Sequence, residues 1–181
     1  MTCCYYSAMQ SSVINSLKFA AEKEQLCAQV PLADLVRLAD TVQPDGALDY
    51  SVTGDVDSHG RPQLHVTVQG TVTLQCQRCL GELRHEIGID NLLWLVSEKE
   101  FEARQDSEEL SDPDEPDCIT AGSELDVLAL VEDEILLALP PYPRHADGEC
   151  MKDNVGNVGK VANKPAENEH TAFSALVKLR K

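Results

Sequence analysis

The sequence has little of the material from which membrane proteins and secreted disulfide-rich proteins are built. Aromatic residues make up only 4% of the chain, and the longest apolar run, from Ile135 to Pro141, is far too short to cross a bilayer. The N-terminus has no basic stretch followed by a long apolar one, so no secretory signal is expected. The seven cysteines are odd in number and irregularly spaced, which argues against a disulfide framework. These absences predict a cytoplasmic protein, away from membranes, with reduced thiols.

Motifs for the common enzyme chemistries are also missing. The chain has no Gly-rich phosphate loop, no Gly-x-Ser-x-Gly and no His-Glu-x-x-His. Its five histidines are scattered along the sequence. The sequence therefore predicts no catalytic residues and a protein that is not an enzyme.

Positive charge is scarce: 15 Lys and Arg stand against 31 Asp and Glu, a net charge of −16. Such a surface repels phosphate backbones and attracts basic partners. Half of the net charge lies in residues 98–117, where ten acids against Lys99 and Arg104 give −8. This composition predicts a flexible acidic loop. A mimic of nucleic acid that holds a basic partner is the alternative interpretation.

The clearest pattern in the chain is the alternation of apolar and polar residues from Leu64 to Ile89. Period-two alternation with β-branched residues is typical of strands with one buried and one wet face. With similar patterns on either side, it predicts an antiparallel meander of strands at 47–56, 62–76 and 82–97. Gly70 interrupts the middle strand and predicts a bulge or bend there.

Shorter elements are expected around this meander. They are a helix over 17–25, a strand over 26–30, a helix whose first turn holds Pro31, a strand over 118–120 and a helix that Ser123 opens and Pro140 ends. The predicted fold class is α+β, with an antiparallel, partly closed sheet and a few packed helices.

The composition also predicts how the chain divides. Residues 1–8 are expected to be a disordered lead or a start-site artefact, since Met9 offers a second start. Residues 9–143 would form one domain, and 144–170 a flexible linker rich in Gly, Asn, Lys and Glu. Residues 171–181 have the pattern of an amphipathic helix with a basic end, which suits either the helix dipole or a docking peptide.

Three adjacent acids, Glu132, Asp133 and Glu134, interrupt the apolar pattern of the helix before Pro140. Neighbouring helical residues point in different directions, so these acids do not form a preset acid–base pair. We expect a solvated face instead. This face, with Phe173 and Leu176 of the C-terminal helix, is the predicted partner-binding surface.

Two potentially reactive or metal-binding thiols lie in the predicted turn between the second and third strands of the meander, which reads Cys76-Gln-Arg-Cys79-Leu-Gly. A thioredoxin-like redox pair needs a thiolate at a helix N-terminus, which this context does not offer. A zinc site fits better but needs two more ligands. His145 and Cys150 are the candidates, with Cys118 as an alternate. Two thiols without a metal remain a second possibility.

Three blocks of the sequence resemble a known family. They are Leu74 to Cys79, Glu124 to Pro140 and Ala172 to Leu179. Together, from about Met9 to the C-terminus, they are similar to the YceD family, the large ribosomal RNA subunit accumulation proteins. The resemblance places the family's cysteine turn on Cys76 and Cys79, and its segment after the helix on His145 and Cys150. Thr171-Ala172 departs from the Asn-Pro that is usual before the terminal Phe.

The resemblance implies a non-enzymatic role in synthesis, processing or stability of 23S ribosomal RNA during large-subunit assembly. The charge then favours a basic partner, either a large-subunit ribosomal protein or an assembly factor. Two alternatives stay open. One is a thiol oxidoreductase that uses Cys76 and Cys79, and the other is an RNA-binding module that uses Arg78, Arg84 and the C-terminal helix.

Overall fold

The computed structural model describes residues 13–106 and 115–150. The chain divides into two units, 1–150 and 151–181, and every described residue belongs to the first. In chain order its elements are β1 (Val13–Ile14), α1 (Ser16–Ala21), β2 (Gln25–Pro31), the 3₁₀ turns η1 (Leu32–Asp34) and η2 (Val36–Leu38), β3 (Ala47–Val56), β4 (Pro62–Gln75), β5 (Glu82–Val96), α2 (Glu98–Asp106), β6 (Asp117–Thr120), β7 (Leu125–Asp126) and α3 (Val127–Ala138).

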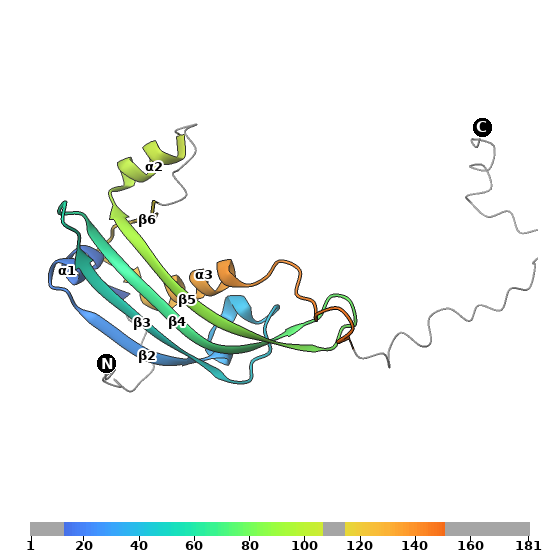
Figure 1. Ribbon diagram of the computed structural model, residues 1–181. Coiled ribbons are helices and arrows are strands. Elements are labelled where there is room, and N and C mark those ends of the chain that lie inside the picture. Colours follow the sequence, from blue (N-terminus) through green and yellow to red (C-terminus); the bar gives the residue numbers. More distant parts are fainter. Residues whose placement is uncertain (1–12, 107–114, 151–181) are drawn as a thin grey trace, which may run out of the picture. The chain divides into compact units, whose positions relative to one another are not determined.

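A five-stranded sheet in the order β2-β3-β4-β5-β6 dominates the fold (Figure 1). Strands β3, β4 and β5 form the predicted antiparallel meander; β2 extends it on the β3 side, also antiparallel, and β6 joins β5 in parallel. The α+β class is confirmed. The sheet is open rather than partly closed, because β2 and β6 form its two edges and do not pair with each other. A separate two-stranded sheet joins β1 to β7.

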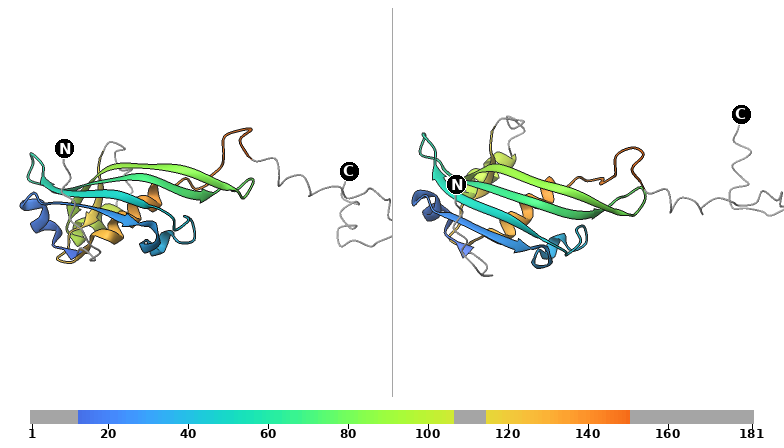
Figure 2. Two further views of the ribbon diagram at one scale, coloured as in Figure 1. Left: turned by 90° about the horizontal axis from the view of Figure 1, so that it is seen from below. Right: turned by 60° about the horizontal axis from the view of Figure 1, so that its bottom comes forward.

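The alternating residues of β4 point to a buried face and a more exposed face of the sheet, as the sequence pattern predicts. Leu64, Val66, Val68 and Val72 of β4 are completely buried, while the polar residues between them lie on the opposite face, more or less open to solvent. Figure 2 shows the helical elements gathered on one side of the sheet, where α1, η1, η2 and α3 cover its apolar face. Because each fully buried Val or Leu contributes about 1.5–3 kcal/mol, this layer accounts for much of the stability.

Glycine allows α1 to lie against β3. A Cβ atom added at Gly54 would stand 2.4 Å from the Phe19 carbonyl oxygen, which belongs to rigid backbone. At Gly70, a Cβ atom would stand 2.5 Å from Leu48 Cδ2. The pairing of β4 with β5 continues through Gly70 without a bulge, so the predicted bulge is wrong; its φ of +152°, which residues with a side chain rarely adopt, explains this glycine.

We expect Gly54→Ala to destabilise the protein by about 1–3 kcal/mol, the usual cost of overpacking, because α1 must move to admit the methyl group. The matched control is Gly88→Ala on β5, since a Cβ atom there meets nothing within 4 Å. Urea unfolding monitored by circular dichroism measures both changes. Equal midpoints for the two variants would contradict the packing explanation.

Two predicted helix starts are wrong. The chain after Pro31 forms the two 3₁₀ turns instead of an α-helix, because the Leu32 N–H donates to the distant Gly46 carbonyl (3.0 Å) and starts a tight turn. Helix α3 begins after Asp126 and not near Ser123. The Asp126 carboxylate accepts the N–H groups of Leu128 (2.9 Å) and Ala129 (3.2 Å), which makes it the N-cap.

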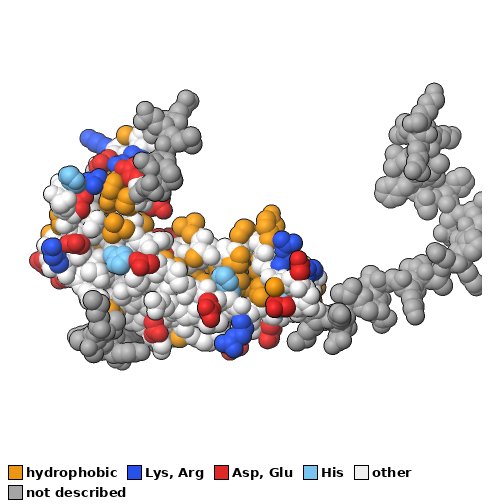
Figure 3. All heavy atoms as spheres, viewed as in Figure 1, with side chains coloured by type: hydrophobic (Ala, Val, Ile, Leu, Met, Phe, Trp, Pro, Cys, Tyr) orange, Lys and Arg blue, Asp and Glu red, His pale blue; other side chains and the backbone are white. Residues whose placement is uncertain are grey.

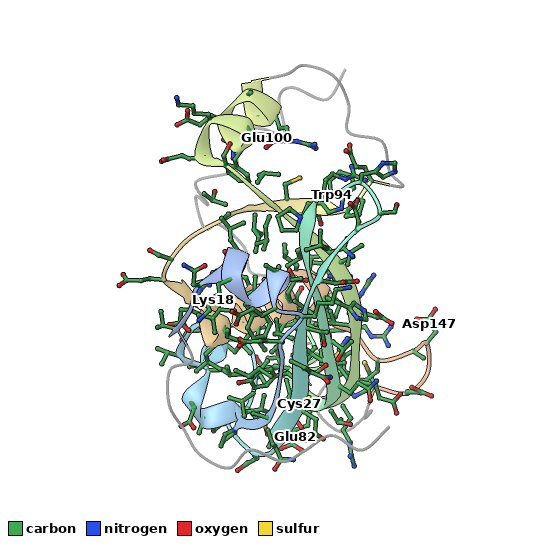
Figure 4. The ribbon with its side chains drawn as sticks, turned by 90° about the vertical axis from the view of Figure 1, so that its left-hand side faces the viewer. Lys18, Cys27, Glu82, Trp94, Glu100 and Asp147 are labelled. Carbon is green, nitrogen blue, oxygen red and sulfur yellow. The ribbon has the colours of Figure 1, made fainter. Side chains whose placement is uncertain are left out.

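The acidic segment is more ordered than a flexible loop at its start, where residues 98–106 form α2. The Arg61 guanidinium lies over the Trp94 ring, 3.9 Å from its centroid, and the Arg104 guanidinium of α2 is 5.6 Å from the same centroid. Arg104 also pairs with Glu115 at 3.3 Å. These cation–π and ionic contacts hold α2 beside the end of the sheet, and Figure 4 shows Glu100 on this helix. Within the described part of the chain, no helix is long and apolar enough to cross a membrane.

Candidate metal centre

The turn between β4 and β5 has the backbone of a metal-binding knuckle. The Cys76 N–H donates to the Gly81 carbonyl (2.9 Å), and the Leu80 N–H donates to the Cys76 carbonyl (2.8 Å). Leu80 has φ +60°, a left-handed conformation that leucine rarely adopts. Strain of this kind persists only where the surrounding structure enforces it. The turn brings the Cys76 and Cys79 side chains to the same side, and both are buried.

The segment that follows α3 supplies the other half of the centre. Pro143 accepts the Gln77 N–H at 2.9 Å, which ties this segment to the turn. His145 Nε2 lies 2.9 Å from the Glu82 carbonyl oxygen at the start of β5, the position of a donor to that carbonyl. The proton on Nε2 then leaves Nδ1 as a free lone pair, turned toward the sulfur atoms. This second contact is the usual way in which a metal-ligating histidine is oriented.

The four ligand atoms of Cys76, Cys79, His145 and Cys150 all lie within 4.8 Å of one another. Tetrahedral zinc with its usual bond lengths requires about 3.8 Å between two sulfur atoms and about 3.6 Å between sulfur and nitrogen. The structure has 3.9 Å between the Cys76 and Cys150 sulfur atoms. His145 Nδ1 lies 3.5 Å from Cys79 Sγ and 3.8 Å from Cys150 Sγ. The side chains thus already have the spacing of a tetrahedral ligand set and could bind a metal.

The electrostatics of the centre favour a thiolate at Cys76. Burial opposes its ionisation, but backbone N–H groups of Cys79, His145 and Arg78 outweigh burial and lower its pKa to about 5. The thiols of Cys76 and Cys150 raise the pKa of His145. At Cys79 the Gly81 N–H favours the thiolate, yet burial and the neighbouring thiols raise the pKa above its ordinary value. One thiolate disfavours the ionisation of a neighbouring thiol, because the two negative charges repel each other. A bound cation would offset this repulsion and stabilise several thiolates together.

The sequence prediction placed these four residues together, and the structure brings them together. Cys118, the alternate ligand, lies elsewhere: it pairs with Trp94 across β5 and β6. The described part of the chain contains no other group of three or more potential metal ligands at this spacing.

The acids of α3 differ from the expected solvated face. Glu132 and Glu134 are buried. The Glu132 carboxylate accepts the Arg37 N–H at 2.6 Å, and the Glu134 carboxylate accepts the Asn91 side-chain amide at 2.6 Å. Only Asp133 is at the surface, where it pairs with the Arg37 guanidinium. The prediction of a solvated face is therefore wrong for two of the three acids, because α3 turns them toward η2 and β5.

The other predicted partner-binding residues, Phe173 and Leu176, lie outside the described residues, as do the expected lead at 1–8 and most of the predicted linker. Their roles stay predictions. The residue that the sequence analysis missed at the metal centre is Arg78. Its position between two cysteines was the only available signal, and that signal does not distinguish a surface arginine from one that contacts the centre.

Comparison of the sequence with known proteins identifies a family. The sequence profile described as "Large ribosomal RNA subunit accumulation protein YceD" matches residues 64–180, more than half of the chain. The chain belongs to the YceD family. The match begins within β4 and not near Met9, so it covers less of the chain than the resemblance indicated, but it includes all four residues of the candidate centre.

A large ribosomal RNA subunit accumulation protein YceD from Haemophilus influenzae is 27% identical to this YceD-family chain over 113 residues. The alignment covers 62% of this chain and 62% of the relative, so the chain spans less than two thirds of that protein's length. No solved structure matches the chain.

Proposed function

We propose that this protein supports the accumulation of 23S ribosomal RNA in large-subunit assembly, without acting as an enzyme. The observation that carries the proposal is the family match over residues 64–180, in a family named for large ribosomal RNA subunit accumulation. The named relative from Haemophilus influenzae points to the same process. A cytoplasmic location, a linker that follows the segment of His145 and Cys150, and an amphipathic C-terminal helix over residues 171–181 are parts of this proposal.

The proposed partner is a basic protein, either a large-subunit ribosomal protein or an assembly factor. The net charge of −16 supports this choice, since it opposes association with naked RNA. Figure 3 shows acidic side chains distributed along the viewed face rather than confined to one patch. The RNA-binding alternative loses one of its residues, because the Arg78 guanidinium is engaged within the chain.

Affinity purification from cell extract, with and without ribonuclease, tests the proposed partner. We expect a basic large-subunit protein to be recovered equally well in both samples. Recovery of large-subunit components only when RNA is intact would contradict a direct protein partner and favour the RNA-binding alternative. Depletion of the protein, followed by quantification of 23S relative to 16S RNA, tests the function itself, because no change in that ratio would contradict it.

We also propose that Cys76, Cys79, His145 and Cys150 bind one structural zinc ion. Three thiolates and one imidazole form a donor set that suits zinc, and four protein ligands leave no open position for a substrate. Elemental analysis of protein purified without chelator should give about one zinc per chain. A value well below a tenth of an equivalent would contradict the proposal.

The thiol oxidoreductase alternative receives less support from the geometry. Its nucleophile must be accessible to a substrate disulfide, yet the Cys76 side chain is fully buried and Cys79 is only 8% exposed. An assay of disulfide reduction separates the two functions. Turnover that depends on Cys76 and Cys79 would favour the enzyme, whereas zinc retention without turnover would favour the structural centre.

A further inference from the structure

Arg78 lies between the two cysteines of the turn, and contacts within the chain engage its guanidinium on several sides. Its Nε donates to the Cys150 sulfur at 2.9 Å. Nη1 pairs with the Asp147 carboxylate at 3.0 Å. Nη2 donates to the carbonyl oxygens of His145 (3.3 Å) and Ala146 (3.2 Å). Asp147 is labelled in Figure 4 on the segment that leads to Cys150.

These contacts all reach the half of the centre that has no regular secondary structure of its own. Cys76 and Cys79 are fixed by the β4–β5 turn, whereas His145 and Cys150 come from a segment beyond α3 that forms neither helix nor strand. The planar guanidinium offers five donors in a rigid fork, so it can hold the backbone and a side chain of that segment at once. Arg78 therefore joins the two halves independently of any metal.

Arg78 also suits the charge of the proposed centre. Zinc with three thiolates and a neutral imidazole has a net charge of −1, which is costly to bury without a counter-charge. The arginine supplies a permanent positive charge, and its Nε–H points directly at one of the three sulfur atoms. A lysine would keep the charge but could not form the same fork.

We propose that Arg78 is a positioning residue for the metal centre: it docks the His145–Cys150 segment onto the turn and balances the charge of the three thiolates. This inference rests on the zinc proposal above. It assigns Arg78 a role within the fold rather than in contact with RNA. Polar groups that orient metal ligands commonly contribute about 10–100-fold in metal affinity, which sets the scale of the expected effect.

The test compares zinc affinity in the full-length chain and three variants, by competition with a chromophoric chelator at constant pH. Arg78→Gln should weaken binding by about 10–100-fold, since it removes both the charge and the fork. The zinc affinity of Arg78→Lys should lie between the affinities of Arg78→Gln and the parent protein. Arg84→Gln is the matched control: it removes the same charge from an exposed position on β5 a few residues away, and its affinity should stay that of the parent.

Cobalt(II) gives a readout that a general loss of structure would not reproduce. At saturating cobalt, Arg78→Gln should show the same sulfur-to-metal charge-transfer intensity as the parent protein, because its four ligands are unchanged. Parent-like zinc affinity in Arg78→Gln, or an equal loss in Arg84→Gln, would overturn the role of Arg78 and leave the zinc proposal standing. Failure of the parent protein to bind zinc or cobalt would overturn both proposals.

Discussion

We expect Cys76→Ser to abolish binding of the proposed zinc ion and to lower the stability of the folded protein. A serine hydroxyl is a poor zinc ligand at neutral pH, and Cys76 is fully buried in the centre, with its sulfur 3.9 Å from that of Cys150. Metal that binds only the folded state contributes its binding free energy to folding. At a free zinc concentration about 100 times the dissociation constant, that contribution is about 2.7 kcal/mol.

Differential scanning calorimetry with and without added zinc measures this effect. The parent protein should melt at a higher temperature when zinc is added after chelation, and Cys76→Ser should not respond to zinc. Cys118→Ser is the matched control, because Cys118 is a partly buried cysteine of β6 outside the centre. An equal response to zinc in the parent and Cys76→Ser would show that the metal binds elsewhere.

In Cys76→Ser, the loss of stability should begin near the candidate metal centre. The centre lies at the far end of the long β4–β5 hairpin (Figure 1), while the main apolar core packs between one face of the sheet and the helical elements. Opening of the turn and of the segment after α3 exposes few core residues. Hydrogen exchange in Cys76→Ser should therefore rise first at the turn and near His145, and the amides in the middle of β4 should remain protected.

The long strands were predictable because their pattern is both repeated and physically enforced. Shifting β4 by one residue would turn Val66 and Val68 to solvent, so the alternation specifies the register as well as the strand. The predicted ranges 47–56, 62–76 and 82–97 agree with the structure to within a residue. The grouping of the four candidate ligands was predictable for a different reason, since few residue types bind zinc and they recur at short spacings.

The elements that sequence reasoning missed have no comparable pattern. Strands β1 and β7 contain two residues each and exist only because they pair with one another across the chain. The burial of Glu132 is decided by a long-range partner, the backbone N–H of Arg37. Asp126 lies three residues beyond Ser123, and both are good caps, so the sequence offers two helix starts and tertiary pairing chooses between them.

The last expected result concerns the acidic helix α2 and the rate of partner binding. Glu98, Glu100 and Glu102 are exposed on an ordered helix, and replacing all three by glutamine should slow association with a basic partner by about tenfold at low salt. Dissociation should change less, because charges at a distance from the contact mainly steer the encounter. The matched control replaces the exposed Asp34, Asp40 and Asp45 by asparagine, which removes the same charge from η1 and the region before β3 instead of from α2.

Stopped-flow or surface-based kinetics with the partner recovered by affinity purification provides the measurement. The difference between the parent and the α2 variant should shrink as salt rises, because the Debye length falls from about 10 Å at 0.1 M to about 3 Å at 1 M. An equal slowing in the control would assign the steering to net charge alone and not to α2. Association rates that are insensitive to salt in all three proteins would contradict electrostatic recognition of a basic partner altogether, and apolar contacts would then have to carry the binding.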